Sequence, residues 1–437
     1  MPWSGLDTAA VARALSQLAE RPEDLVDAYF ERREEMELAA AGDAPGLLVR
    51  REEGFALRLV RERQTWLAAR DGITGRAFMD ALRQVARALP AASYPEPALP
   101  TAHPAAEATA RELLDFPPAV SRAVRGHHAG FPLRMVVRRH HRSLQVVGTR
   151  LISGPESESY YSCVVETAWG RQGALLPGLD GAAAEEVAAA VVALFRSRNS
   201  APPLPYRGVA VLAPPAVAVL LHEAVAHALE ADVLAQGGNP EAAVGVAMAA
   251  ACVDVLDDPA GAPHQVRRST DDEGSAVCRR WLLRGGVVEQ PLADMAWART
   301  SPALIPGAAR RGSRHLPPGP RSSHLELLAG DTAEADLLAE ADGGLFLPAA
   351  SRGALDPLSG EFALHLPYAR RIRRGSLAEP VGPCVLRGRV ADLLTRVAAV
   401  GAVARPAGAG WCAKEGQKLP VWATAPALRL DGVAVGP

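Results

Sequence analysis

The chain has 437 residues, of which 49% are hydrophobic and 22% are charged. Because a domain typically holds about 150 residues, this length indicates two or three domains with substantial cores. The 47 basic residues nearly balance the 49 acidic ones, and the net charge of −2 excludes a whole-chain argument for nucleic acid or an anionic membrane as a partner. Only two of the basic residues are lysines, Lys414 and Lys418, and the rest are arginines.

The cysteines and the apolar segments predict the compartment. The five cysteines are an odd number, are widely spaced and include no CxxC pair, so a reducing environment is expected rather than a disulfide scaffold. We see no basic stretch before an apolar core at the start, and the apolar runs fall short of about 18 residues. We therefore expect a cytoplasmic protein with no membrane segment.

Hydrophobic spacing along the first part of the chain predicts alternating helical and extended segments. The helices are expected at residues 9–40, 76–89 and 181–196. The strands are expected as two short ones within 47–59, with Gly54 at the turn between them or at a bulge, and as longer ones within 132–154 and 158–170. The proline- and alanine-rich residues 89–108 predict a loop.

The polar, proline-rich residues 197–208 predict a domain boundary, which divides the chain into residues 1–200 and 201–437. Beyond it, a short strand at 209–212 precedes a helix from Pro215 to about Gln236, and short strands continue to the end. The expected fold class is α+β. An N-terminal domain of helices and antiparallel sheet is followed by a strand-rich C-terminal domain that carries this helix.

This helix contains the densest group of candidate catalytic residues, His222, Glu223, His227 and Glu230. In the zinc-protease pattern HExxH, the two histidines are four residues apart and about 40° around the helix axis, so both reach one metal ion. Here they are five residues apart, which is about 140° on a regular α-helix. A shared metal therefore requires a π-turn or a break in the helix, and π-turns are frequent at functional sites.

An ordinary amphipathic helix is the alternative, because the four polar residues would form a single polar face. The approach from Val209 to Leu221 is almost entirely apolar, however, and this favours burial. Buried histidine and glutamate side chains without partners would be costly, so the surroundings favour a metal site.

Three further segments contain candidate functional residues. Cys412 lies among glycines and close to both lysines, which is typical of an exposed cysteine that readily forms a thiolate. Residues 138–142, RRHHR, predict an exposed row of arginines on a strand. Residues 271–274, DDEG, are compatible with a polar turn or with an active-site contact.

The motifs together resemble the TldD/PmbA family of metallopeptidases. HEAVAHALEAD is similar to the HExxxH metal helix of that family, and CAKEGQKLPV is similar to its late cysteine- and lysine-containing segment. The intervening and upstream segments that match in order are VDVLDDP, STDDEGSAVCRRWLLRGGVV, LDPLSGEFAL, AYFERREE and EEGFALRL. The resemblance covers nearly the whole chain. Because the HExxxH helix and the cysteine are both present, the chain resembles the catalytic TldD type.

The resemblance implies a role for particular residues. They are the metal ligands His222, His227 and Cys412, the general base Glu223, and the supporting or substrate-contacting residues Glu230, Lys414, Asp272 and Glu273. The implied cofactor is one Zn²⁺ ion, with another divalent ion such as Fe²⁺ as the alternative. Two imidazoles and a thiolate leave one open position on tetrahedral zinc, as catalytic sites require.

The resemblance also implies a substrate class and an assembly. It predicts a peptidase for unfolded or small peptides, including modified ones, that works inside a cavity enclosed by a dimer. The dimer partner would be a TldE-type subunit or a second copy of this chain. The alternatives are a non-catalytic partner subunit and a metal amidase that acts on a non-peptide intermediate. Ala226 and Ala413 stand where the family usually has glycine.

Overall fold

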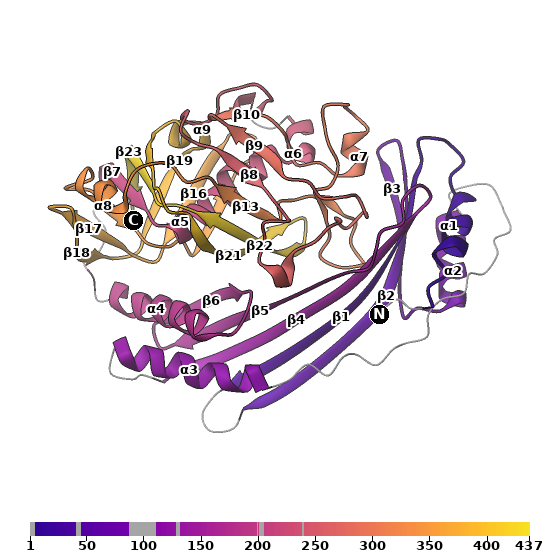
Figure 1. The fold of residues 1–437 in the computed structure, drawn as a ribbon, viewed down its shortest axis with the longest axis horizontal. Coiled ribbons are helices and arrows are strands. Elements are labelled where there is room, and N and C mark those ends of the chain that lie inside the picture. The colour runs from indigo at the N-terminus through magenta and orange to yellow at the C-terminus, as the bar shows by residue number, and fades with distance from the viewer. Residues whose placement is uncertain are drawn as a thin grey trace.

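A computed structural model of the chain describes residues 5–40, 45–86, 111–127, 132–198, 200, 205–237 and 240–437. Long, curved N-terminal strands form one part of the molecule, and the C-terminal part lies over them (Figure 1). Helices α1 and α2 pack at one end of the curved sheet, and α3 and α4 pack at the other.

The N-terminal elements comprise helices and antiparallel strands. The helices are α1 (Thr8–Ser16), α2 (Gly75–Ala86), α3 (Arg111–His127) and α4 (Gly181–Arg198). The strands are β1 (Leu25–Ala40), β2 (Gly46–Arg61), β3 (Gln64–Asp71), β4 (Arg134–Gly148), β5 (Glu156–Thr167) and β6 (Gly170–Leu176).

The C-terminal elements are mostly short strands. The helices are α5 (Pro214–Leu220), a π-helical segment (Leu221–Ala226), a 3-10 turn (His227–Leu229), α6 (Ala231–Ala235), further 3-10 turns (Pro240–Ala242 and His264–Val266), α7 (Met295–Ala298), α8 (Glu334–Ala339) and α9 (Val390–Leu394). The strands up to β15 are β7 (Tyr206–Leu212), β8 (Val255–Asp257), β9 (Arg280–Arg284), β10 (Val287–Val288), β11 (Ala309–Arg310), β12 (Gly319–Pro320), β13 (His324–Leu327), β14 (Leu345–Leu347) and β15 (Arg352–Leu355). The strands that follow are β16 (Glu361–Leu366), β17 (Ala369–Arg373), β18 (Ser376–Val381), β19 (Cys384–Arg389), β20 (Val397–Val400), β21 (Arg405–Lys414), β22 (Gln417–Ala425) and β23 (Leu428–Gly436).

Strands from both parts join in one twelve-stranded sheet with the order β10-β9-β8-β13-β22-β21-β6-β5-β4-β1-β2-β3. The two parts meet where Leu175 of β6 pairs with Ala409 of β21. A nine-stranded sheet has the order β15-β16-β19-β23-β7-β14-β17-β18, with β20 paired to β23. The strands are antiparallel except for the parallel pairs β13–β22 and β14–β7, and together with the segregated helices they confirm the α+β class. The boundary between residues 1–200 and 201–437 stays a prediction.

Two predicted elements near the N-terminus are wrong. The helix expected over 9–40 ends at Ser16, and residues 25–40 form β1. Pro22 follows the helix, and a residue before proline avoids the helical conformation. The apolar residues of β1, including Tyr29 and Phe30, are buried because both faces of this strand are covered, which removes the alternation expected of a strand.

The turn or bulge predicted at Gly54 is also absent, because residues 46–61 form the single strand β2, which pairs with β1 and β3 without a shift in register. A Cβ on Gly54 would lie 2.2 Å from the carbonyl oxygen of Arg70 and 2.5 Å from Nε of Arg314. Glycine is therefore needed there for close packing and not for a turn.

The other expected elements are confirmed, with shifts of a few residues: α2, β4, β5, α4 and β7. The helix expected from Pro215 to about Gln236 begins at Pro214, but it is interrupted at Glu230, whose backbone is extended, before α6. Residues 87–110, which include all of the predicted loop, lie outside the described residues. In the described residues, no helix is long and apolar enough to cross a membrane.

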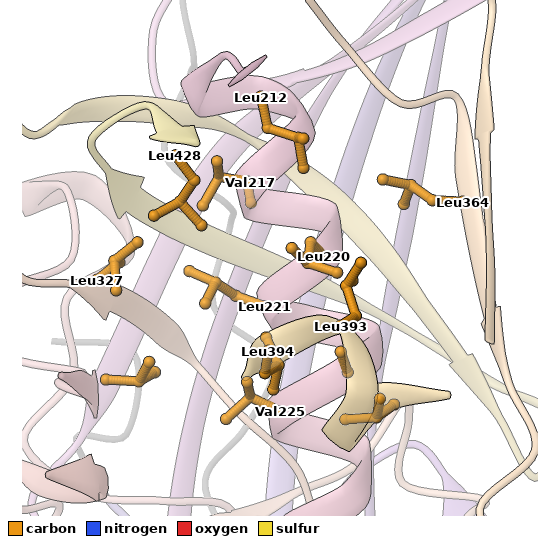
Figure 2. Close-up of a cluster of buried hydrophobic side chains, with 14 of the residues drawn as sticks. Leu212, Val217, Leu220, Leu221, Val225, Leu327, Leu364, Leu393, Leu394 and Leu428 are labelled. Atoms are coloured by element: carbon orange, nitrogen blue, oxygen red, sulfur yellow. The ribbon is translucent and has the colours of Figure 1, made fainter. Parts of the chain in front are cut away.

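The helix α5 and its π-helical continuation lie inside the main C-terminal core. Leu220, Leu221 and Val225 pack with leucines from surrounding strands and from α9 (Figure 2). This arrangement disfavours the amphipathic surface helix considered above, because an exposed helix would turn one face to water. The polar residues of the segment are therefore held in a largely apolar environment.

Candidate metal centre

The helix that carries the two histidines changes its hydrogen-bond pattern between them. The backbone N–H of His227 donates to the carbonyl of His222, and this bond to the fifth residue back defines a π-turn. The centroids of the two imidazole rings are 4.5 Å apart. The π-turn required by the five-residue spacing is thus confirmed, and it brings both rings to one side of the helix.

The third candidate ligand comes from the far end of the chain. Sγ of Cys412 in β21 lies 3.6 Å from Nε2 of His227. The donor atoms of His222, His227 and Cys412 all lie within 4.8 Å of one another. The cysteine is only 2% exposed, which corrects the prediction of an exposed thiol. Its polar neighbours suggested the surface, but alternate residues of a strand point to opposite faces, and Cys412 points inward.

The residues of this cluster are chemically suited to a metal ion. Nε2 of His222 is buried and has no hydrogen-bond partner among the described residues, while Nδ1 of the ring lies 3.5 Å from Oγ of Ser322. Burial, together with the charge of His227, lowers the pKa of His222 to about 3. The ring is therefore neutral, and its free lone pair is available to a cation. Two imidazoles and a thiolate form a donor set typical of zinc.

Glu230 connects this cluster to Lys414. Its Oε2 lies 3.1 Å from Nδ1 of His227 and accepts a hydrogen bond of 2.7 Å from Nζ of Lys414. Lys414 also donates to Asp232, at 2.6 Å. Burial alone would lower the pKa of His227, but Glu230 and Cys412 raise it to about 10. The cluster thus favours a positive charge at this position, which a metal cation would supply in place of the ring proton.

Glu223 follows the first histidine and lines a cavity beside the cluster. Burial raises the pKa of its carboxyl group, which makes it a better proton acceptor. Gly353 of β15 lies directly against this side chain, since a Cβ there would be 2.2 Å from Cγ of Glu223. The chain has 39 glycines, and nothing in the sequence distinguishes Gly353 from the others.

The cavity has a volume of about 1080 Å³ and lies where the two parts of the chain meet. One wall carries His222, Glu223, His227 and Glu230. Further lining residues from the N-terminal sheet and from the β21–β22 hairpin are Arg33, Arg138, His140, Tyr160, Trp411, Lys414 and Lys418. Both lysines of the chain therefore line this cavity.

Residues 138–142 correct the prediction of an exposed arginine row. Arg142 is only 7% exposed, and His140 lines the cavity and stacks on Tyr160 with a centroid distance of 4.8 Å. Side chains do alternate between the two faces of this strand, as predicted. The sequence could not show that the C-terminal part covers this sheet.

The structure does not bring Asp272 and Glu273 to the cavity, and neither side chain lines it. Asp272 pairs with Arg142 and Arg268, each at 2.8 Å. Glu273 pairs with Arg58 at 2.6 Å. These buried ion pairs join the C-terminal part to strands β2 and β4 of the N-terminal sheet.

Comparison with known proteins gives a consistent picture. The family model of the PmbA/TldA metallopeptidase C-terminal domain matches residues 207–437. A metalloprotease TldD homolog from Haemophilus influenzae is 30% identical over 220 residues, which are 50% of this chain and 46% of that protein. A metalloprotease from Methanothermobacter thermautotrophicus is 31% identical over 242 residues, or 55% of this chain and 53% of that protein. The chain thus spans about half the length of these curated relatives in the matched regions.

Two solved structures share the fold across nearly the whole chain. TldE from Thermococcus kodakarensis has a TM-score of 0.75 at 17% identity and covers 98% of this chain and 100% of its own. A putative modulator of DNA gyrase from Thermotoga maritima has a TM-score of 0.72 at 17% identity, with 98% and 99% covered. At such low identity, these similarities establish the fold alone.

Proposed function

Since the chain belongs to the PmbA/TldA metallopeptidase family, we propose that it is a zinc-dependent peptidase for unfolded or small peptides, modified ones included. One observation carries the proposal. The donor atoms of His222, His227 and Cys412 converge within 4.8 Å beside a cavity that Glu223 also lines. No ordinary packing requirement explains three lone-pair donors, two of them buried and one partly buried, that face one another.

In this proposal, His222, His227 and Cys412 hold the ion. A zinc ion bound there would polarise the amide carbonyl and lower the pKa of a water molecule toward about 7. Glu223 accepts a proton from the attacking water and delivers it to the leaving amine. Glu230 holds Nδ1 of the His227 ring, which leaves Nε2 for the ion.

Lys414 has a supporting role in this proposal. It pairs with both Glu230 and Asp232, so it holds the carboxylate that orients the histidine. The resemblance left open whether Lys414 supports the site or contacts the substrate. The two ion pairs favour the positioning role.

The cavity is large enough for a short peptide segment, since typical ligand pockets measure about 300–1,000 Å³. We further propose that the active form is a dimer, with a TldE-type partner or a second copy, and that dimerisation encloses the cavity. A solved structure of similar fold is a TldE, which supports a partner of this type. The cytoplasmic location stays a prediction, supported by the five free cysteines.

Metal analysis of the purified protein tests the centre directly. The wild type is expected to hold about one zinc ion per chain. Cys412→Ala should lose most of this zinc, because the two remaining ligands are too few to hold the ion. Cys384→Ala, at another buried cysteine, is the matched control and should keep its zinc. A wild type without stoichiometric metal would contradict the proposal and favour a non-catalytic partner subunit.

A second experiment separates binding of the metal from catalysis. Glu223→Gln should keep the zinc and lose about 10²- to 10⁴-fold in the rate of peptide hydrolysis, which is the range of general base catalysis. Activity at the wild-type level would remove Glu223 as the base. A panel of peptides and non-peptide amides, assayed with the wild type, distinguishes the peptidase from a metal amidase.

A further inference from the structure

One wall of the cavity is both aromatic and positively charged. It is formed by strands β1, β4, β5, β21 and β22, which come from both parts of the chain. We call this surface the cationic wall. Its residues are Arg33, Arg138, His140, Tyr160, Trp411 and Lys418, and the acidic Glu35 lies among them.

The rings of the cationic wall pack against one another. His140 stacks on Tyr160 with a centroid distance of 4.8 Å. Trp411 meets both rings edge-on, with centroid distances of 6.0 Å to His140 and 6.1 Å to Tyr160. Nζ of Lys418 lies over the Trp411 ring, 4.4 Å from its centroid. This contact holds the ammonium group in place at the surface of the cavity.

The cations of the wall differ in their partners. Arg33 pairs with Glu31 at 2.6 Å, and Arg138 pairs with Glu37 at 2.7 Å. For Lys418, the described part of the chain offers no carboxylate oxygen within 4.0 Å of Nζ. Its charge is therefore available to a ligand.

The charges of the wall act together on His140. Burial, and then the positive charges of Arg138, Arg33 and Lys418, lower the pKa of His140 to about 4. The imidazole is therefore neutral, although Glu35 lies 3.4 Å from its Nδ1. Because Arg33 and Arg138 are already paired with carboxylates, Lys418 is the cation of this wall that can attract an anionic ligand.

We propose that Lys418 binds a carboxylate group of the substrate, and that the neighbouring rings of Trp411 and Tyr160 pack against the carbon atoms beside that carboxylate. This inference rests on the proposed function, because it names a substrate class for the same cavity. The carboxylate belongs either to the C-terminus of a peptide or to an acidic side chain. In both cases an ammonium group and an aromatic surface provide the recognition.

The position of Lys418 separates this subsite from the metal centre. Lys418 pairs with Ala413 across the β21–β22 hairpin, and Leu419 pairs with Cys412. Because side chains alternate along a strand, Lys418 and Trp411 lie on the face of the hairpin opposite Cys412. A change at Lys418 can therefore alter substrate preference while the zinc ligands stay in place.

Binding measured without hydrolysis tests this inference. The protein is the zinc-loaded variant Glu223→Gln, and calorimetry measures its affinity for three peptides. Each peptide is N-acetylated and consists of alanines with a single phenylalanine. The first has a free C-terminal carboxylate, the second a C-terminal amide, and the third a C-terminal amide with one internal glutamate. We expect one or both carboxylate-bearing peptides to bind about tenfold more tightly than the neutral one, and which of them does so identifies the source of the carboxylate.

The variants then assign the preference to one residue. The affinity ratio is the affinity for a carboxylate-bearing peptide divided by that for the neutral peptide. In the Glu223→Gln protein, a second substitution Lys418→Met, which keeps the aliphatic stem, should reduce this ratio to about one. Lys418→Arg should preserve most of the preference. Arg171→Met removes another cation that lines the cavity and should leave the ratio near tenfold. Zinc content is measured for each variant.

Two outcomes would overturn the inference: equal binding of all three peptides, or a preference that survives Lys418→Met with zinc retained. Failure of the proposed function looks different. In that case the wild type does not hydrolyse these peptides, whereas the affinity ratio still depends on Lys418.

Discussion

Two buried clusters of polar side chains lie in this molecule, and they differ in chemistry. The cluster at the junction of the two parts, here the junction network, contains Arg58, Arg142, Arg268, Asp272 and Glu273, and its carboxylates pair with guanidinium groups. The metal centre contains His222, His227 and Cys412, whose donor atoms face one another.

The difference shows how a structural cluster can be told from a functional one. In the junction network each carboxylate pairs with a guanidinium group, so no metal cation is needed there to balance the negative charge. Three lone-pair donors cannot satisfy one another, and a proton or a metal cation must lie between them. Burial and polarity alone do not distinguish the two clusters, because Asp272 and Glu273 are as deeply buried as Cys412.

The largest expected effect is the loss of stability when the junction network is broken. Arg142 pairs with Glu31, Glu158 and Asp272, so Arg142→Met leaves three carboxylates without this partner and should cost about 3–5 kcal/mol of unfolding free energy. Urea denaturation measures the loss, and the exposed Arg387→Met is the control. The folded fraction should still bind zinc stoichiometrically. A loss below about 1 kcal/mol, the value of a surface pair, would show that the network is not structural.

The next effect concerns the geometry of the proposed base. Gly353→Ala pushes a methyl group into the side chain of Glu223 and should lower kcat by up to about 100-fold, because small displacements of a catalytic group are costly. Zinc content should stay close to wild type, and the overlap should cost about 1–3 kcal/mol of unfolding free energy, so that the protein stays folded in the assay. Gly388→Ala, where the nearest atom would lie at 3.6 Å, is the matched control. Full activity of Gly353→Ala would show that the position of Glu223 is not critical.

A smaller effect, on zinc affinity, is expected from the ion pairs that Lys414 makes beside the metal centre. Lys414→Arg should weaken zinc binding by about tenfold, because a broad guanidinium cannot take the place of a compact ammonium between Glu230 and Asp232. Competition with a chelator measures the affinity. Lys418→Arg makes the same chemical change at the only other lysine and should leave zinc affinity as in the wild type. Equal affinities for all three proteins would contradict the positioning role of Lys414.

The smallest effect is a dependence of stability on pH. Burial opposes ionisation of Asp272, but Arg142 and Arg268 outweigh it and hold the pKa of this carboxyl well below its usual range. Its contribution to stability is therefore present above the unfolded pKa of about 4, and it is lost as the pH falls below that value, by at most about 1.4 kcal/mol per pH unit. Unfolding by urea at several acidic pH values measures this slope. Asp272→Asn should make the slope shallower, and an identical slope would remove Asp272 as its source.

The sequence alone identified the features that depend on near neighbours. The spacing of His222 and His227 required a π-turn, and the structure contains it. Most helices and strands followed from hydrophobic spacing, because each contacts the core with a regular face. Strand β1 was mistaken for a helix, since it is covered on both sides and lacks the alternation of a half-exposed strand.

Contacts between distant segments were decided only by the tertiary structure. The resemblance to a family, and not the residue pattern, placed Cys412 with the histidines. Gly353 and Ser322 carried no local signal, and Arg138, His140 and Lys418 were noted in the sequence without any sign that they share one wall of a cavity. In the sequence, nothing distinguished Asp272 and Glu273 from the other candidate site residues. Only the structure shows that both pair with arginines away from the cavity.

The physical reason lies in the range of the forces involved. Hydrogen bonds within a helix act over four or five residues, so the sequence shows where the helical ligands must lie. The metal centre, the cavity and the two lysines that line it depend on which strands pair and which faces become buried. These are properties of the whole chain, and the composition that singled out Lys414 and Lys418 could not show that each lysine acts on a different face of one hairpin.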